Sequence, residues 1–349
     1  MSDFTLIIND GILKGVETST DTVFENGRRF PDKKAQIGKV VIPNDVTTIG
    51  ANAFDDYVGI EEVVFPDNLA TIENRAFHGC DGLVSIAIPS SVSSVGDGAF
   101  SNCENLKEAI IQNDVVGDNM FFDCKALCKI TLSDNVTIIG KGAFGNTNIE
   151  ELVLPDSVKN VGAGCFSYCK NLKSVVLSSA LKAIGNEMFS QCKALEQIEI
   201  SNKVKTIGTS SFENCESLKC IDLPDSVTSI GTSAFAKCKN LAEVKLSKCL
   251  KEIKPYAFNE CNSIEELEIP DTIERVDSIA SGAFSNTAIK KVLFPKALVN
   301  QTLPFPNNWI KSQSSRDDKG NFIELKEKEF TLEEICHTIN LSPDAIELY

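Results

Sequence analysis

Histidine, methionine and tryptophan are scarce in this 349-residue chain. It has one Trp, three Met and two His, and the histidines, His78 and His337, lie far apart in the sequence. A histidine-based nucleophile relay or metal site needs such groups in one place. No glycine-rich loop has the spacing of a phosphate cradle. We therefore expect no enzymatic activity, no cofactor and no bound metal.

The thirteen cysteines lack the spacing of a zinc site or a disulfide framework. The closest pairs, Cys124 with Cys128 and Cys165 with Cys169, have three intervening residues, whereas structural zinc sites use Cys-x-x-Cys pairs. Most of the others recur about 23 residues apart. We interpret them as reduced, buried thiols, which favours a reducing compartment such as the cytoplasm. Disulfides between stacked units are the alternative.

Long apolar runs and an excess of positive charge are also absent. No stretch approaches the roughly 20 apolar residues of a membrane span, and the N-terminus has no signal-peptide pattern. The formal charge of -15 argues against nucleic acid and against anionic membrane surfaces. It favours a protein partner with a basic patch.

What the sequence has in abundance is repetition. A phenylalanine recurs, in most cases every 23 residues, and such a fixed period is typical of repeat architectures. The step is 21 residues to Phe121 and 22 to Phe166; it is 26 to Phe284, which predicts about three extra residues near Ser278 to Ala280. The series is Phe54, Phe77, Phe100, Phe121, Phe144, Phe166, Phe189, Phe212, Phe235, Phe258 and Phe284.

Each unit predicts one short strand, a turn and a tight corner. A run such as Leu172, Val175 and Leu177 predicts a strand with one buried face. Twelve such strands, from Val40 to Phe294, would form one long parallel sheet. Three residues after the phenylalanine, eight units carry Cys, a small side chain suited to a buried corner. A single unit cannot bury these side chains alone, whereas a stack of units can.

The two ends of the chain differ from the repeats. Two apolar segments joined by Asn9-Asp10-Gly11 predict a β-hairpin, which we expect to cap the array within residues 1–36. Residues 37–295 would form about 11 to 12 coils. Residues 296–349 would form a C-terminal capping segment, in which a capping box at Thr331 to Glu334 predicts a short helix near residues 331–340.

The repeated pattern, LPDSVTSIGTSAFAKCKNL at residues 223–241, resembles the BspA-like, or treponemal-type, leucine-rich repeat family. The resemblance covers residues 37–295. It implies a curved, right-handed leucine-rich-repeat solenoid that is rich in strands and has few true helices. Members are commonly surface proteins of bacteria and protists, linked to adhesion and to binding host proteins. A cell-surface or secreted location is therefore the alternative to the cytoplasm.

One outward-facing position of each strand suggests a binding surface. Stacking aligns these positions into columns along the array. One column is apolar or Thr up to Val176 and charged from Glu199 to Glu268. The neighbouring outward column adds Glu243 and Glu266. We predict a protein-binding face made of an apolar stripe (Val41, Val64, Ile110, Val153 and Val176) and an acidic patch (Glu199, Asp222, Glu243, Glu266 and Glu268). The alternative is that the valines only favour strands and that the acids only aid solubility.

The sequence thus predicts a non-enzymatic protein–protein interaction module, which binds its partner through the outward face of its strands. One alternative is a cell-surface adhesin of the BspA-like type for host matrix protein or glycan. A passive structural spacer is another. We expect no binding to nucleic acid and no insertion into membranes, and the sequence does not predict an oligomeric state.

Overall fold

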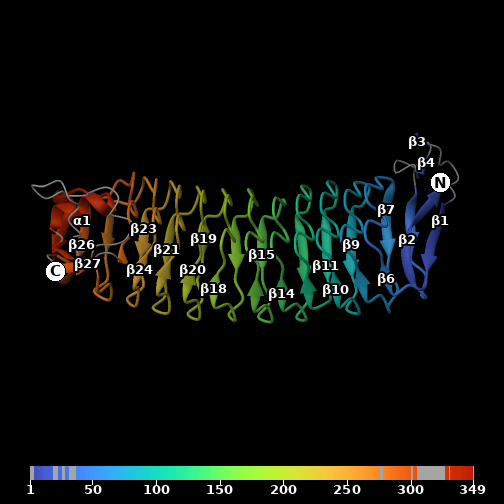
Figure 1. The fold of residues 1–349 in the computed structure, drawn as a ribbon, viewed down its shortest axis with the longest axis horizontal. Helices are drawn as coiled ribbons and strands as arrows, with labels where there is room; N and C mark the ends of the chain where they lie inside the picture. The colour runs from blue at the N-terminus through green and yellow to red at the C-terminus, as the bar shows by residue number, and fades with distance from the viewer. Residues whose placement is uncertain are drawn as a thin grey trace, which may run out of the picture.

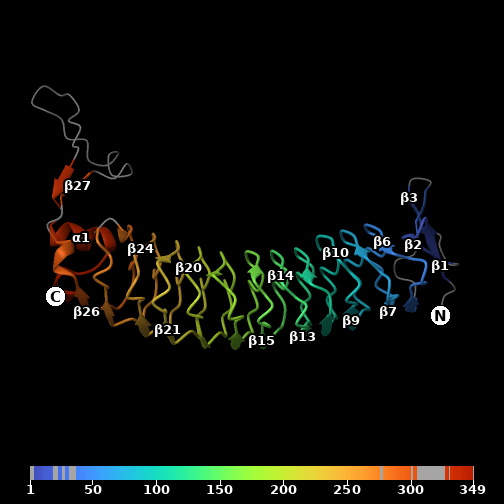
Figure 2. The ribbon, with the colours of Figure 1, turned by 90° about the horizontal axis from the view of Figure 1, so that it is seen from below.

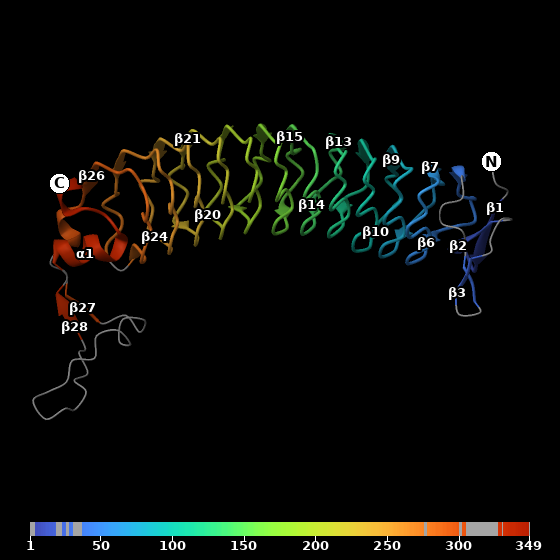
Figure 3. The same cartoon turned by 90° about the horizontal axis from the view of Figure 1, so that it is seen from above.

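The chain folds into a solenoid whose two ends lie far apart (Figure 1) and which is gently curved (Figures 2 and 3). The computed structural model describes residues 4–18, 23–25, 28–30, 37–275, 278–299, 302–304, 327–329 and 331–348. The predicted boundary at residue 36 and much of the predicted C-terminal segment, residues 305–326, lie outside these ranges. The strand-rich, leucine-rich-repeat architecture agrees with the sequence prediction.

The twelve predicted strands form a parallel row, called here the outer row. It follows the convex edge of the arc (Figures 2 and 3). Its strands are β5 (Gly38–Val41), β7 (Ile60–Val64), β9 (Ser85–Ile88), β11 (Glu108–Ile111), β13 (Lys129–Leu132), β15 (Glu151–Val153), β17 (Ser174–Val176), β19 (Gln197–Ile198), β21 (Cys220–Asp222), β23 (Glu243–Lys245), β25 (Glu266–Glu268) and β26 (Lys291–Phe294). Its hydrogen-bonded ladder is interrupted, for example between β7 and β9 and between β19 and β21. The convex edge of an arc is its longer edge, which is consistent with these gaps.

A second parallel row of two-residue strands, called here the inner row, follows the concave edge (Figures 2 and 3). The sequence analysis did not predict it, because two residues are too few to show alternation. Its members are β6 (Thr48–Ile49), β8 (Thr71–Ile72), β10 (Ser94–Val95), β12 (Val115–Val116), β14 (Ile138–Ile139), β16 (Asn160–Val161), β18 (Ala183–Ile184), β20 (Thr206–Ile207), β22 (Ser229–Ile230) and β24 (Glu252–Ile253).

The glycine that follows many inner strands allows the coils to approach closely. A Cβ atom at Gly231 would lie 2.6 Å from the carbonyl carbon of Gly208, a distance that real Cβ contacts do not reach. A larger residue would therefore push these two coils apart at the inner edge. The repeated Ile-Gly pairs thus serve coil packing at the concave side of the arc.

The longest step of the repeat is accommodated differently from the prediction. Ile279 lies within the segment expected to hold the extra residues, yet it is buried and forms a parallel bridge with Ile253. It therefore occupies the inner-row position of its coil, five residues before Phe284, as Ile253 does before Phe258. The extra residues therefore precede Ile279.

The eleven repeated phenylalanines stack in one continuous ladder through the core. All are fully buried. Neighbouring ring centroids lie 4.8 to 5.8 Å apart, with interplanar angles of 1° to 17°. The backbone is hydrogen-bonded in the same direction. Each phenylalanine amide donates to a carbonyl of the coil or helix that follows, as from Phe189 to Ser211 at 2.8 Å.

The corner cysteines are also bonded from coil to coil. In all eight, the Sγ atom donates to the phenylalanine carbonyl of the preceding coil at 3.0 to 3.2 Å, as from Cys215 to Phe189. All thirteen cysteines are free thiols, and ten of them are buried. Burial raises the pKa of the Cys169 thiol to about 11, which keeps it protonated at neutral pH.

The turn after each ladder phenylalanine uses a left-handed residue. Its φ lies between 55° and 67° in all eleven coils, from Asn146 at the lower end to Gly79 at the upper. Asn, Asp and Gly hold seven of these positions, and these residue types adopt this conformation most easily.

Both ends of the array are covered by chain that continues the stacking. β1 (Phe4–Asn9) and β2 (Ile12–Thr18) form the predicted antiparallel hairpin, and β2 extends the inner row by pairing with β6. β3 (Val23–Glu25) and β4 (Arg28–Phe30) form a further antiparallel pair.

At the other end, α1 (Leu332–Ile339) has the predicted capping box, with Thr331 as N-cap residue. The amide of Phe284 donates to the carbonyl of Ile339 at 3.3 Å, so α1 takes the place of a further coil. β29 (Ile346–Leu348) extends the outer row beside β26. The remaining elements are η2 (Lys296–Leu298), η3 (Pro343–Ala345) and the antiparallel pair β27 (Thr302–Pro304) and β28 (Glu327–Glu329).

Truncating one ring of the ladder should destabilise the array. We expect Phe189→Ala to lower the free energy of unfolding by about 3 to 5 kcal/mol, because a buried aromatic is lost and a cavity remains. Phe122→Ala is the matched control, since this phenylalanine lies outside the ladder and is 38% exposed. Urea unfolding followed by circular dichroism measures both, and equal losses would contradict a special role for the ladder.

The thiols should divide into two reactivity classes. We expect Cys128, Cys220 and Cys249, which are exposed, to react rapidly with a thiol reagent in the folded protein at pH 8. The other ten should react only on unfolding, because burial excludes the reagent and disfavours the thiolate. Time-resolved titration with a chromogenic disulfide, with and without denaturant, measures this. Rapid reaction of most thiols in the folded protein would contradict the structure.

Candidate protein-binding face

The structure places the predicted apolar stripe on the exposed side of the outer row. Val41, Val64, Val153 and Val176 are exposed by 57%, 37%, 66% and 60%, whereas Ile110 is half-buried. The strand register brings neighbours side by side, since Val41 is opposite Val64 and Val153 is opposite Val176. The stripe is interrupted, because Ala87 and Thr131 flank Ile110.

The five predicted acidic residues also lie exposed on this side, but they differ in their pairing. Asp222 accepts a hydrogen bond from Lys245 Nζ at 2.7 Å, and this contact raises the pKa of Lys245. Within the described residues, the other four acids take part in no ion pair or side-chain hydrogen bond. They are Glu199, Glu243, Glu266 and Glu268. Asp222 therefore contributes little free negative charge to the patch.

Several charges on the outer strands, or directly before them, are paired between neighbouring coils. Lysine and glutamate side chains meet at 2.6 to 2.8 Å, and the partners are 21 to 25 positions apart in the sequence. The pairs are Lys39–Glu62, Glu108–Lys129, Glu150–Lys173, Glu196–Lys219 and Glu265–Lys290. Like charges on adjacent strands are destabilising, so the neighbouring Glu243 and Glu266 depart from this pairing.

Two adjoining depressions cross the face where the valines give way to the acids. The first, of about 760 Å³, is lined among others by Val176, Ile198 and Glu199. The second, of about 790 Å³, is lined among others by Glu243 and Glu266. Both include Asp222 and Lys245, so together they extend from β17 to β25. The sequence analysis did not predict them, although the small outward residues Ser174 and Cys220 were a visible signal.

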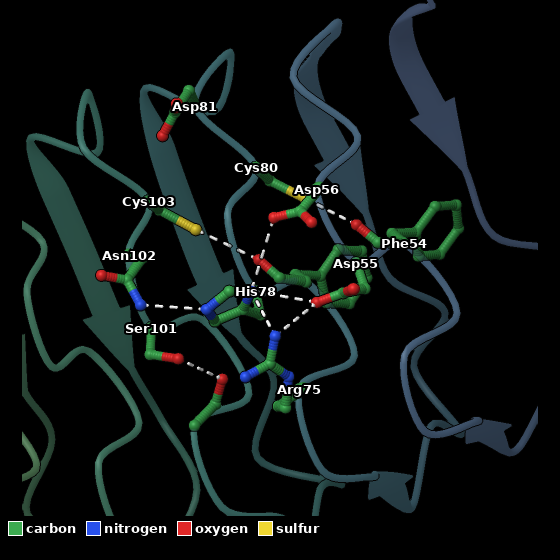
Figure 4. Close-up of polar contacts among 12 residues, drawn as sticks. Phe54, Asp55, Asp56, Arg75, His78, Cys80, Asp81, Ser101, Asn102 and Cys103 are labelled. Atoms are coloured by element: carbon green, nitrogen blue, oxygen red, sulfur yellow. Dashed lines mark hydrogen bonds and ion pairs between the residues drawn. The ribbon is translucent and has the colours of Figure 1, made fainter. Parts of the chain in front are cut away.

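A separate polar cluster surrounds His78, near the N-terminal end (Figure 4). His78 Nδ1 lies 2.9 Å from Asp55 Oδ1 and 3.6 Å from Asp56 Oδ1. Asn102 Nδ2 lies 2.9 Å from the other ring nitrogen. The His78 side chain is only 14% exposed, and the sequence analysis did not predict this cluster. The signal was available, because Asp55 precedes His78 by one 23-residue period.

The geometry of this cluster favours a structural role over a metal site. The ligand atoms of Asp55, Asp56 and His78 lie close enough to contact one ion. However, Arg75 Nη2 lies 3.1 Å from Asp55 Oδ1 and 3.0 Å from His78 Nδ1. Its guanidinium already supplies a positive charge at that place and would repel a metal ion. We therefore interpret the cluster as a polar link between consecutive coils.

No helix in the described part of the chain combines the length and the apolar character needed to cross a bilayer.

Comparison with solved structures shows what this architecture is similar to. A leucine-rich repeat protein from Bacteroides ovatus shares 22% identity, with a TM-score of 0.58, over 85% of this chain and 94% of the other. A leucine-rich cell surface protein from Faecalibacterium prausnitzii shares 25% identity, with a TM-score of 0.52, over 87% and 90%. The pneumococcal vaccine antigen PcpA shares 22% identity, with a TM-score of 0.51, over 84% and 79%. Among curated proteins, none matches.

The family comparison matches most of the chain. The model for the BspA-type leucine-rich repeat region matches residues 29–121, 113–200 and 182–303. These segments contain the whole phenylalanine ladder, the corner cysteines and both rows of strands between β5 and β26. The chain belongs to the BspA-type leucine-rich repeat family.

Proposed function

We propose that this protein is a non-enzymatic binding module whose protein partner contacts the outer row between β15 and β25. The observation that carries the proposal is the position of the two adjoining depressions. They lie where the exposed Val176 meets three carboxylates, Glu199, Glu243 and Glu266, that form no ion pair within the described residues. A concave surface with apolar and charged groups side by side is typical of recognition sites.

The partner should carry an apolar group beside basic groups. Val153 and Val176 are exposed by 66% and 60%, and covering them with an apolar side chain removes that area from water. Lys or Arg of the partner would neutralise Glu199, Glu243 and Glu266, none of which is paired within the described residues. Relief of the repulsion between Glu243 and Glu266 adds to this gain. Charge complementarity of this kind raises both association rate and specificity.

A cell-surface adhesin is the second candidate. It is supported by the similar protein from Faecalibacterium prausnitzii, which is described as a cell surface protein. The same outer row would then bind host matrix protein. The passive spacer that the sequence left open differs from both candidates, because it requires no partner on this face.

Two variants of the outer row should weaken partner binding. The full chain is used as bait in an extract of its native source, captured proteins are identified by mass spectrometry, and each is then purified for a Kd measurement. We expect Val176→Asp to weaken binding at least tenfold, because it places a charge in the apolar half of the contact. Glu199→Lys with Glu266→Lys should weaken it by about fivefold to tenfold and reduce its salt dependence.

The matched control is Asp45→Lys with Glu187→Lys, which makes the same change in charge at exposed positions off the outer row. Its Kd should remain within about twofold of the unmodified protein. If every purified partner binds all variants equally well, the outer row is not the binding face. Finding no partner at all would favour the spacer.

A further inference from the structure

The inner edge of the array carries a row of lysines. Lys159, Lys182, Lys205 and Lys251 each stand directly before an inner strand, namely β16, β18, β20 and β24. All four are exposed. Each is separated from the next by one period of 23 residues, except that Thr228 takes the place between Lys205 and Lys251. We call these four residues the lysine row.

The members of the lysine row are neighbours in space. The amide of Lys205 donates to the carbonyl of Lys182 at 2.8 Å, Thr228 donates to Lys205 at 2.8 Å, and Lys251 donates to Thr228 at 2.9 Å. Adjacent positions are therefore about 5 Å apart, as between paired strands. The row crosses five coils on the concave side of the arc, at the edge opposite the outer row (Figure 3).

The fold does not require lysine at this position. Described coils outside the row have Thr47, Ala70, Ser93, Asp114 or Thr137 there. Where the residue has a hydroxyl group, it can bond to the preceding coil: the Oγ1 atom of Thr228 donates to the Lys205 carbonyl at 3.3 Å. Lysines stacked on adjacent coils repel one another instead. A feature that disfavours the folded array needs another explanation.

Nothing in the described part of the chain neutralises the row. Among the residues that the structure describes, none of the four lysines takes part in an ion pair, in contrast to Lys173 and Lys219, which precede outer strands. The nearby Glu252 is engaged elsewhere, because it accepts from Ser229 Oγ at 2.6 Å and pairs with Lys254 at 2.7 Å. Within an acidic protein, this leaves a linear strip of positive charge at the inner edge.

We propose that the lysine row binds a linear anionic polysaccharide through its sulfate or carboxylate groups. A line of single charges at regular spacing suits a chain that carries one acidic group after another, rather than a compact anion. The neighbouring outward residues Asn160 and Thr206 offer hydrogen-bonding groups for sugar hydroxyls. This site is separate from the proposed protein-binding face and does not depend on it.

Single-stranded nucleic acid fits the row less well. Its binding sites use aromatic side chains on which the bases stack. In the described residues, the exposed aromatic rings are Phe122, Tyr168 and Tyr256, all within two positions of a ladder phenylalanine. None stands at or next to a position of the lysine row. A nucleic acid could therefore bind the lysine row only through the charges of its phosphates.

The test is fluorescence anisotropy of an end-labelled heparin octasaccharide with the full chain. We expect binding that weakens on the order of tenfold between 50 and 200 mM NaCl, as for other polyanions held by a few lysines. Replacing Lys159, Lys182 and Lys205 by Gln should weaken binding at least tenfold. Thr228→Lys, which fills the gap, should strengthen it about threefold.

The matched control replaces three ion-paired lysines of the outer row, Lys173, Lys219 and Lys290, by Gln. Its change in net charge is the same, and its affinity should remain within about twofold. Equal affinity of the row variant and the unmodified protein would overturn the proposal. So would tighter binding of a labelled oligothymidine with the same number of charges. Row-dependent self-association in sedimentation velocity would also overturn it, because the occupant would then be a second copy.

Discussion

Contact between neighbouring coils is the interaction on which this structure depends. A coil of about 23 residues cannot cover its phenylalanine alone, so each ring of the ladder is stacked between the rings of the coils before and after it. The amide and thiol bonds from coil to coil follow the same direction. The stability and shape of the array therefore depend on stacking along its axis. Equivalent surface positions of successive coils form columns in the same direction.

Much of the fold could be predicted from the sequence, because residues at the same place in successive repeats occupy equivalent places in successive coils. The burial of Phe189 and Cys215, the exposure of Val176 and Glu199, and the hairpin before the first coil all follow from that frame. The capping box at Thr331 needed only local pattern. These features depend on backbone geometry and burial, which the repeat determines in the same way for each coil.

Two kinds of feature were not predicted from the sequence: very short strands and contacts between particular side chains. The inner row escaped notice because its strands have two residues each. The link from Asp55 to His78 was visible as a 23-residue separation, but its partly buried geometry was not. The pairing of Asp222 with Lys245, which removes one acid from the predicted patch, depends on rotamers that no period determines. The place of the extra residues before Ile279 could not be predicted, because the length of the step gives their number but not their position within the coil.

The way in which α1 meets the last coil bears on the length of the array. The Phe284 amide donates its hydrogen bond to the carbonyl of Ile339 in the helix. The last phenylalanine turn is therefore bonded, but the helix does not provide another turn of the same kind. A stack of coils is in principle open to growth, since each exposed end resembles the surface that the next coil would cover. The helix therefore ends the series of phenylalanine turns, although β29 adds one more strand to the outer row.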